Sequence, residues 1–316
     1  MRQQLDTKQQ NTPAVSIIMN CFNGEKYLRE AIDSIYAQTY PNWEIIFWDN
    51  ASTDSSADIA KSYDGRLRYF RGEETIPLGA ARNKALEQAK GEFIAFLDCD
   101  DIWMPEKLEK QIPLFNDFDV GLVYSDVINF NENEENHRFY GGKLQCIGRC
   151  FNHLLQDYFL SMPTVIVRRA ALEQESEWFD PRFELIEECE LFIRIAYRWK
   201  LNMCPDVLAK YRVHLASISW AKRDHFFNEQ LIMLHKYDGL FPDFSANYYL
   251  LQKGIYISRA HYLWLINDGK QARKIILPYM FKNQKAFCLY FVSFFPYKII
   301  YRILNLIGTN IKPKGF

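Results

Sequence analysis

Short apolar runs alternate with amphipathic segments along the first 125 residues. Runs of mostly apolar residues predict buried strands at 15–19, 44–48, 67–70, 93–97 and 120–124. Between these runs, apolar residues recur at helical spacing, as at Leu28, Ile32 and Ile35. Strands and helices that alternate in this way are typical of an α/β fold, in which helices flank a mostly parallel sheet.

The pattern changes after residue 125. Residues 161–169 predict a further strand, and an amphipathic helix is predicted to begin at Glu187. From residue 245 onward the chain is predicted to be helical. We therefore expect a disordered N-terminus at 1–14, an α/β domain at 15–220 and a helical region at 221–316.

Composition and charge narrow the classes of function. The chain has 316 residues, 48% of them hydrophobic, and a formal net charge of −1, so it can bury a large core and shows no sign of a nucleic-acid partner. Its seven cysteines include no Cys-x-x-Cys pair, which argues against zinc and against a disulfide framework. Residues 1–13 are polar and lack the apolar core of a signal peptide, so we expect a cytoplasmic protein.

The C-terminal region is basic and amphipathic. Residues 269–316 contain nine basic residues and no acidic ones, which leaves the rest of the chain with an acidic surplus of ten. Residues 286–297 carry no charge, but they are too few for a membrane span, which needs about twenty residues. After Pro296, the polar and basic positions fall on one helical stripe. Such a segment can lie on an anionic membrane surface through 286–309, or it can pack against the acidic body of its own chain.

Three carboxylates follow a strongly apolar predicted strand. Asp98, Asp100 and Asp101 come after the run 93–97. Ligands of open α/β sheets bind beyond the carboxyl ends of the strands, and carboxylates crowded there repel one another unless a cation neutralises them. Oxygen ligands suit Mg²⁺ or Mn²⁺, which usually also hold substrate phosphates. The stretch predicts a metal–diphosphate site, although Asp101 alone is equally typical of a helix cap.

Two other positions carry candidate binding residues. Asp49 follows the second predicted strand, where a nucleotide-binding sheet places an acid for hydrogen bonds to ribose or base. Arg82 lies near the start of a predicted helix, whose free N–H groups also favour anions, and the small residues before it allow close packing. The Gly-x-Gly-x-x-Gly pattern is absent after the first strand, which argues against a dinucleotide oxidoreductase.

A group of acids and a late histidine are ambiguous by themselves. Glu187, Glu188 and Glu190 open a predicted helix, and acids in the first turn are typical of surface residues that favour the helix dipole. His214 follows an alternating stretch, and a lone histidine is typical of a structural residue.

Taken in order, these motifs resemble those of glycosyltransferase family 2, whose members have the GT-A fold. The resemblance runs from Val15 to about Ser219. It rests on an opening strand and nucleotide loop at 15–23, an acid with a Ser-Thr-Asp turn at 49–54, a helix start at 81–83, the acid cluster at 97–101, an acid-pair stretch at 179–194 and a late histidine stretch at 211–214. Each motif alone is weak, and six in this order are specific.

The resemblance implies a fold, a site and a cofactor. The fold is a GT-A, Rossmann-like catalytic domain at 15–220, with a nucleotide-binding half at 15–125 and an acceptor-binding half at 126–220. The residues implied to bind a nucleotide sugar are Phe22, Asn23, Asp49, Arg82 and Asp98. The residues implied to hold Mn²⁺ or Mg²⁺ are Asp98, Asp100 and His214, and the implied catalytic acids are Glu188, as the base, and Glu187.

The implied activity is inverting transfer of a sugar from a nucleotide-diphosphate donor to a hydroxyl acceptor. The resemblance suggests a saccharide or lipid-linked saccharide acceptor in bacterial surface polysaccharide or glycolipid synthesis. The protein is expected in the cytoplasm, and its basic amphipathic tail would bring it to the inner face of the cell membrane. A transfer of this kind needs a base for the acceptor hydroxyl and neutralisation of the leaving diphosphate, but no covalent nucleophile.

Two departures from the family pattern keep other interpretations open. Residues 20–23 read Asn-Cys-Phe-Asn where the family usually has Pro-Thr-Tyr-Asn, and Glu188 stands where the family usually has Asp. One alternative is a catalytically weak or silent nucleotide-sugar binder. Another is a metal-dependent nucleotidyltransferase, although the basic Gly-rich loop expected after the first strand of such an enzyme is missing.

Overall fold

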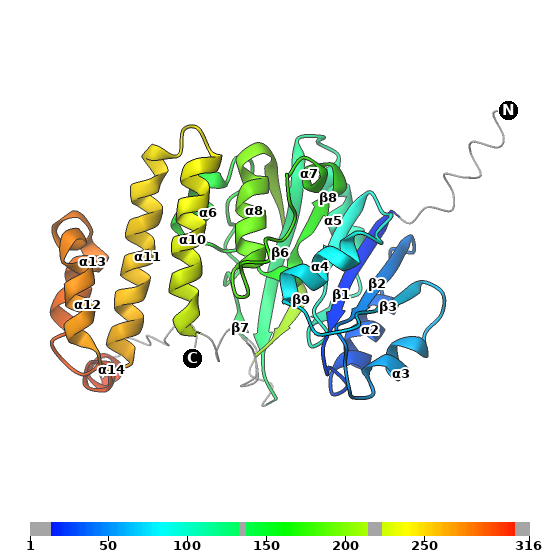
Figure 1. Cartoon of the computed structure of the whole chain (residues 1–316), viewed down its shortest axis with the longest axis horizontal. Coiled ribbons are helices and arrows are strands. Elements are labelled where there is room, and N and C mark those ends of the chain that lie inside the picture. Colours follow the sequence, from blue (N-terminus) through cyan, green and yellow to red (C-terminus); the bar gives the residue numbers. More distant parts are fainter. Residues whose placement is uncertain (1–13, 133–136, 214–222, 307–316) are drawn as a thin grey trace. The chain divides into compact units, whose positions relative to one another are not determined.

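The computed structural model describes residues 14–132, 137–213 and 223–306, and the chain divides into two compact units after Arg223 (Figure 1). The expected disordered N-terminus and His214 lie outside the described residues, apart from position 14.

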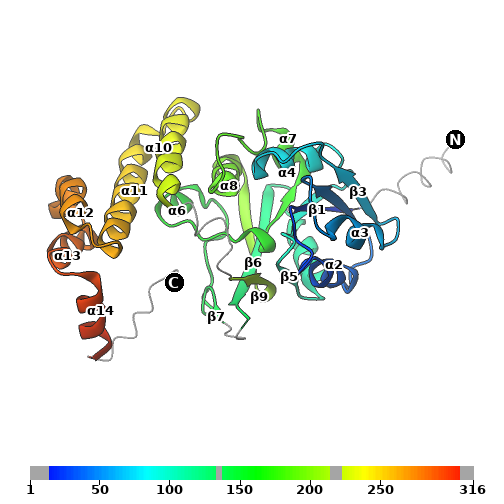
Figure 2. The same ribbon diagram turned by 60° about the horizontal axis from the view of Figure 1, so that its bottom comes forward.

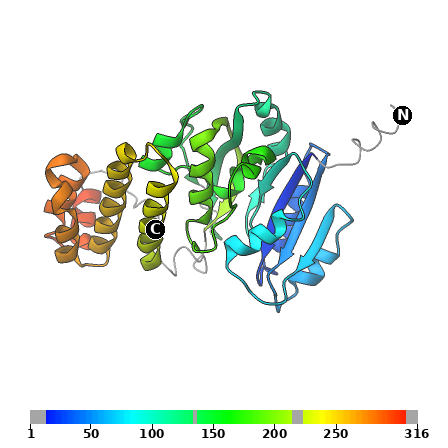
Figure 3. The same cartoon turned by 45° about the horizontal axis from the view of Figure 1, so that its top comes forward.

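The first unit is built on one mixed sheet. In spatial order its strands are β3 (Leu67–Arg71), β2 (Trp43–Asp49), β1 (Val15–Cys21), β4 (Phe93–Phe96), β8 (Ile166–Arg168), β6 (Val120–Phe130), β9 (Lys200–Arg212) and β5 (Ile102–Trp103), with β7 (His137–Arg138) beside β6. The first four are parallel, as are β6 and β9, whereas β8 and β5 run antiparallel to their neighbours. This α/β sheet confirms the predicted fold class (Figure 3).

The predicted strands of the first 125 residues are present, whereas the one strand predicted after them, at 161–169, differs in the structure. Residues 161–169 do not form one strand, because a 3₁₀ turn at Met162–Thr164 precedes β8. Pro163 lies in that turn, and its lack of an N–H suits the turn rather than a central strand. The long strand β9 was missed because its polar residues and Pro205 interrupt the apolar pattern.

Helices cover both faces of the parallel strands. Alternate residues of β1, such as Ile17 and Met19, share a core with α2 (Leu28–Tyr36), and α3 (Ser56–Lys61) adds Ala60 to the same core. On the opposite face lie α4 (Leu78–Leu86), which packs on β1 and β2, and α8 (Glu187–Arg198) (Figure 1). The remaining helices of this unit are α5 (Lys107–Gln111) with its 3₁₀ extension Ile112–Phe115, α6 (Phe151–Gln156) and α7 (Arg169–Glu173).

The parallel strands end at one edge of the sheet, as strands of a parallel sheet must. β1, β2 and β4 end at Cys21, Asp49 and Phe96, and the segments that leave them carry the candidate residues. Two of these segments are joined directly, because the Asn50 N–H donates to the Cys21 carbonyl at 2.8 Å. This edge is where ligands of open α/β sheets bind.

The second unit is helical, as predicted (Figure 2). Its elements are α10 (Arg223–Leu240), α11 (Ser245–Leu265), α12 (Gly269–Ile276), the 3₁₀ helix Leu277–Lys282, α13 (Gln284–Val292) and α14 (Tyr297–Leu306). α11, α12 and α13 share a core that includes Trp264, Ile276 and Leu289. Within the described residues, no helix combines the length and the apolar character that crossing a membrane requires.

Candidate active site

Asp49 is buried at the end of β2 and is held as a carboxylate. Its Oδ1 accepts the Ser52 N–H at 2.7 Å, and its Oδ2 accepts the Tyr69 hydroxyl at 2.6 Å and a hydrogen bond from Arg71. Burial acts to raise the pKa of Asp49, but the hydrogen bonds from Tyr69 and Ser52 outweigh it and leave this pKa below its ordinary value.

Tyr69 and Arg71 were not predicted as site residues. Both lie on β3, where Arg71 pairs in register with Asp49, so only strand pairing brings them to this carboxylate. The Arg71 side chain is 44% exposed, so a positive charge lies at the surface next to Asp49, at this edge of the sheet.

The predicted residues at the end of β1 lie beside the loop after β2. The Phe22 side chain is 50% exposed, so its ring is accessible from solvent. Asn23 has a left-handed φ of 53°, its N–H donates to the Ser52 hydroxyl at 3.0 Å, and its Oδ1 accepts the Thr53 N–H at 2.8 Å. The Asn23 side chain therefore locks the two loops together.

Arg82 connects three of the predicted motifs. Its guanidinium, buried in α4, donates through Nη2 to Asp98 Oδ1 at 2.9 Å and through Nη1 to Glu187 Oε1 at 2.5 Å. The Arg82 side chain is 4% exposed, that of Glu187 3% and that of Asp98 33%. The structure thus brings the helix start, the acid cluster and the acid pair together around one cation.

The small residues that precede Arg82 allow this approach. A Cβ on Gly79 would lie 3.3 Å from the Phe179 Cβ and 3.6 Å from the Glu187 side chain. A larger residue at Gly79 would force Phe179 or α4 to shift slightly, so this position is closely packed, as expected.

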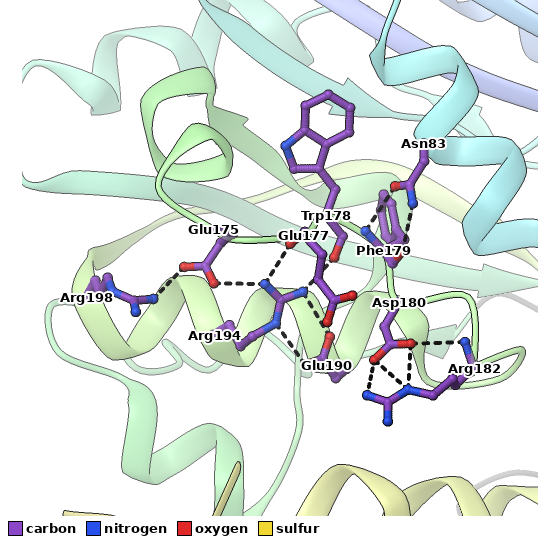
Figure 4. A network of polar contacts seen from close by, with 10 residues as sticks. All are labelled: Asn83, Glu175, Glu177, Trp178, Phe179, Asp180, Arg182, Glu190, Arg194 and Arg198. Carbon is purple, nitrogen blue, oxygen red and sulfur yellow. Dashed lines mark hydrogen bonds and ion pairs between the residues drawn. The ribbon is translucent and has the colours of Figure 1, made fainter. Parts of the chain in front are cut away.

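The segment before α8 is fastened to two helices (Figure 4). Arg194 of α8, 1% exposed, donates to the carboxylates of Glu190 and Glu175 and to the carbonyls of Glu177 and Trp178. Asn83 of α4 pairs with the backbone of Phe179, the residue after Trp178. The Asn83 side chain donates to the Phe179 carbonyl at 2.7 Å and accepts the Phe179 N–H at 3.0 Å. These contacts set where α8 begins and hence where Glu187 and Glu188 lie.

The interpretation of the first-turn acids of α8 as surface residues was wrong for two of the three. Glu187 is 2% exposed and Glu190 is fully buried, while Glu188 is partly exposed. Burial is tolerated because Arg82 and Arg194 supply the counter-charges. The four-residue spacing of Glu190 and Arg194 was a local signal of their pairing, but nothing local pointed from Glu187 to Arg82.

Asp101 belongs to the scaffold of the acid cluster. Its Oδ1 accepts the backbone N–H of Arg212 at 2.8 Å, and the Arg212 Nε donates to the Asp100 carbonyl at 2.8 Å. Burial first, and then the nearby Asp100 and Asp98, hold the pKa of Asp101 well above its usual range. The helix-cap alternative for Asp101 was wrong, because the residues that follow it form β5.

The charges of Glu188 and of the acid cluster act on the same side chain. The pKa of Tyr211 is raised by burial and further by the charges of Asp101, Asp98, Asp100 and Glu188, so all four carboxylates are within electrostatic reach of one phenol. Glu188 and the cluster come from α8 and from the loop after β4, which are far apart in sequence.

Glu187 differs from Glu188 in its surroundings. Burial, followed by repulsion from Glu188, raises the pKa of Glu187 to about 8, although Arg82 opposes the shift. Its Oε2 is buried and has no hydrogen-bond partner among the described residues. One guanidinium faces several carboxylates here, so a proton on Glu187 reduces the surplus of negative charge.

The acid cluster is chemically suited to a divalent ion bound together with phosphates. The described residues contain no group of three or more His, Cys, Asp or Glu that could hold an ion by themselves. Mg²⁺ usually takes only one or two carboxylates and completes its shell with water and substrate phosphates. Asp98 and Asp100, both partly exposed on one loop, are such a donor set.

Residues 16–174 match the model of the family described as "Glycosyl transferase family 2". The chain is 30% identical over 210 residues, 65% of its own length and 79% of the relative's, to the Escherichia coli protein named UDP-Glc:alpha-D-GlcNAc-diphosphoundecaprenol beta-1,3-glucosyltransferase WfgD.

Two solved structures share the fold. Residues 1–349 of Staphylococcus aureus TarS, in complex with UDP-GlcNAc, superpose with a TM-score of 0.66 at 19% identity, over 92% of this chain and 91% of that one. The mannosyltransferase PcManGT from Pyrobaculum calidifontis, in complex with GDP-Man and Mn²⁺, gives a TM-score of 0.61 at 18% identity, over 96% and 88% of the two chains.

Proposed function

This chain belongs to glycosyl transferase family 2, and we propose that it is an inverting, metal-dependent member that moves a sugar from a nucleotide-diphosphate donor to a hydroxyl acceptor. It is a glycosyltransferase with the GT-A fold, and its relatives include enzymes of bacterial polysaccharide synthesis. The observation that carries the finer proposal is the convergence of Asp98, Arg82 and Glu187, from three separate elements, with Glu188 next to Glu187 at the start of α8.

Glu188 is the proposed base. An ionised carboxylate can accept the proton of an acceptor hydroxyl within hydrogen-bond distance. Glu188 is partly exposed, so an acceptor can approach it, whereas the buried Glu187 is held by Arg82. Glu187 accordingly helps to position the base and sets the charge around it, and Glu188 accepts the proton of the acceptor hydroxyl.

The donor is proposed to lie along the carboxyl edge of β1, β2 and β4. Phe22 offers an exposed ring for stacking on the base, and Asn23 keeps the two loops in place. Asp49, which is buried and hydrogen-bonded to Ser52, Tyr69 and Arg71, stays a prediction as a residue that binds the base. Asp98 and Asp100 would hold Mn²⁺ or Mg²⁺, which when bound supplies positive charge for the departing nucleoside diphosphate. His214, predicted as a third ligand, stays a prediction.

The acceptor is proposed to be a saccharide or a lipid-linked saccharide, at the inner face of the cell membrane. The name of the Escherichia coli relative includes a diphosphoundecaprenol-linked sugar, which supports this class. In the C-terminal unit, α13 and the turn after it expose aromatic side chains to solvent, namely Phe287, Phe291, Phe294 and Phe295. We therefore propose that 286–309 rests on an anionic membrane surface; residues 307–309 lie outside the described residues.

A donor screen tests the enzymatic proposal. UDP and GDP sugars would be assayed for hydrolysis and for transfer to a lipid-linked saccharide, each with Mn²⁺, with Mg²⁺ and with EDTA. Metal-dependent transfer with inverted anomeric configuration supports the proposal. Donor-induced thermal stabilisation without hydrolysis or transfer would instead identify the silent binder, and release of diphosphate from a nucleoside triphosphate would identify a nucleotidyltransferase.

A further inference from the structure

A cavity of about 590 Å³ opens in the C-terminal unit beside α12, and three basic residues of that helix line it. They are Lys270, Arg273 and Lys274, and the remaining lining residues are Asp268, Gln271, Leu277 and Tyr290. We propose that this basic pocket binds the phosphate of an anionic phospholipid headgroup. The inference deepens the proposed membrane contact and rests on it, and it does not depend on the glycosyl-transfer chemistry.

The lining of the basic pocket has more positive than negative charge. Lys270, Arg273 and Lys274 are three and four residues apart, so they share one face of α12, where like charges oppose each other. Among the described residues, neither lysine forms an ion pair. The one lining acid, Asp268, accepts the Gln271 N–H at 3.1 Å as the cap of α12. Three cations therefore face one carboxylate in the lining, and an external anion would supply further counter-charge.

Part of the basic pocket is rigid. Arg273 donates to the Ser293 carbonyl, and its guanidinium carbon lies 4.0 Å from the centre of the Phe294 ring. A Cβ on Gly269 would lie 2.1 Å from the same carbonyl, so only glycine allows α12 to begin this close to residue 293. Arg273 is therefore held in place before any ligand arrives, whereas Lys270 and Lys274 are exposed and adjustable.

An apolar rim distinguishes a lipid from a free phosphate. Leu277 lines the cavity and is 50% exposed. Tyr290, also in the lining, packs against Phe291 and Phe294 at ring-centre distances of 5.5 and 5.7 Å. Cations next to exposed aromatic and aliphatic side chains match the boundary between headgroups and acyl chains. Free phosphate would use only the cations.

The experiment compares two double variants of the full chain that remove the same charge from the same unit. Lys270→Gln with Lys274→Gln removes two lysines of the basic pocket. Lys282→Gln with Lys285→Gln removes two exposed lysines that do not line it. Binding is measured by flotation with phosphatidylcholine vesicles, with and without phosphatidylglycerol. The affinity of the pocket variant for phosphatidylglycerol vesicles is expected to fall about 25-fold, at roughly fivefold per lysine.

The control variant distinguishes a headgroup site from a general effect of net charge. A much smaller loss in the control variant supports a headgroup site, while equal losses would show that only net charge matters and would overturn the basic pocket. Absence of flotation by the wild-type chain would overturn both the pocket and the membrane contact, and it would leave sugar transfer intact.

A competition assay tests the source of the phosphate. Inorganic phosphate at millimolar concentration is expected to leave the wild-type chain on the vesicles. Release by phosphate that requires Lys270 and Lys274, together with equal affinity for both vesicle types, would assign the pocket to a free anion and contradict the proposal. Transfer to a soluble acceptor by the Lys270→Gln, Lys274→Gln variant is expected to match wild type, which would show that the variant folds.

Discussion

Arg82 Nη1 and Glu187 Oε1 lie 2.5 Å apart in the interior, although 105 residues separate them in sequence. The same guanidinium also holds Asp98, the first residue of the acid cluster. Both partners of the Arg82–Glu187 pair are removed from water, so each depends on the other to offset its desolvation. This pair therefore links the stability of the fold to the geometry of the proposed site.

Removing Arg82 should destabilise the chain strongly. Arg82→Met would remove the buried cation that is hydrogen-bonded to both Glu187 and Asp98, and the free energy of unfolding should fall by about 3–5 kcal/mol. Denaturant unfolding followed by circular dichroism measures this. Lys84→Met, on the same helix, breaks only the exposed pair with Glu87 and should cost less than about 1 kcal/mol. Equal effects of the two substitutions would contradict the buried-pair assignment.

Glu188→Gln should separate binding from turnover. The amide keeps the size of the side chain but cannot accept a proton, so kcat should fall by about 10² or more while donor binding by calorimetry stays unchanged. Glu173→Gln, at an exposed position of α7, is the control and should behave as wild type. Full turnover by Glu188→Gln would exclude this residue as the base.

Glu188→Asp tests whether the side-chain length of the proposed base matters. This substitution restores the residue that the family usually has, and it keeps a carboxylate at the position. We expect measurable kcat, well above that of Glu188→Gln, because the proton acceptor is retained and only its reach changes. If both variants are equally inactive, the position of the carboxylate rather than its proton affinity limits the reaction.

Stability should depend on pH through Glu187. Its pKa is raised from 4.5 to about 8 in the folded chain, so between these values the folded state retains a proton that the unfolded state has released. The stability that the raised pKa of Glu187 contributes to the folded state is fully present at pH 4.5 and below, and it is lost as the pH rises towards 8. From pH 5 to pH 8, the unfolding free energy of wild type should fall relative to Glu187→Gln by at least about 1 kcal/mol. Parallel curves for the two proteins would argue against the raised pKa.

Asn20 should be a site where an apolar residue stabilises the chain. It is 7% exposed, and neither polar atom of its side chain has a partner among the described residues. Asn20→Leu, of similar shape, should raise the unfolding free energy by about 1 kcal/mol, because a desolvated amide is removed.

Ser16 is the matched control on the same strand. It is fully buried, but its hydroxyl donates to Glu44 at 2.7 Å and accepts the Gly91 N–H at 2.7 Å. Ser16→Ala should therefore lower the unfolding free energy by about 1–2 kcal/mol. A loss of stability in Asn20→Leu as large as in Ser16→Ala would show that Asn20 is satisfied in solution.

The parallel strands and the helical C-terminal unit could be predicted from the sequence because their causes are local. The run 93–97 is apolar throughout since both faces of β4 are covered, and Leu28, Ile32 and Ile35 recur at the spacing of one buried helix face. The order of motifs also identified the family, which the match over 16–174 confirms. Strand β9 could not be predicted in the same way, because Pro205 and several polar residues interrupt its apolar pattern. Only its pairing with β6 identifies it as a strand.

The arrangement of charges was decided by the tertiary structure alone. Acids at the start of α8 have the same local pattern whether they face water or the interior, and only the packing of α4 places Arg82 against Glu187. Arg71 reaches Asp49 because two strands pair in a given register. Hydrophobic periodicity determines which segments fold, whereas the electrostatic energy of a side chain depends on distances and burial that no short stretch of chain contains.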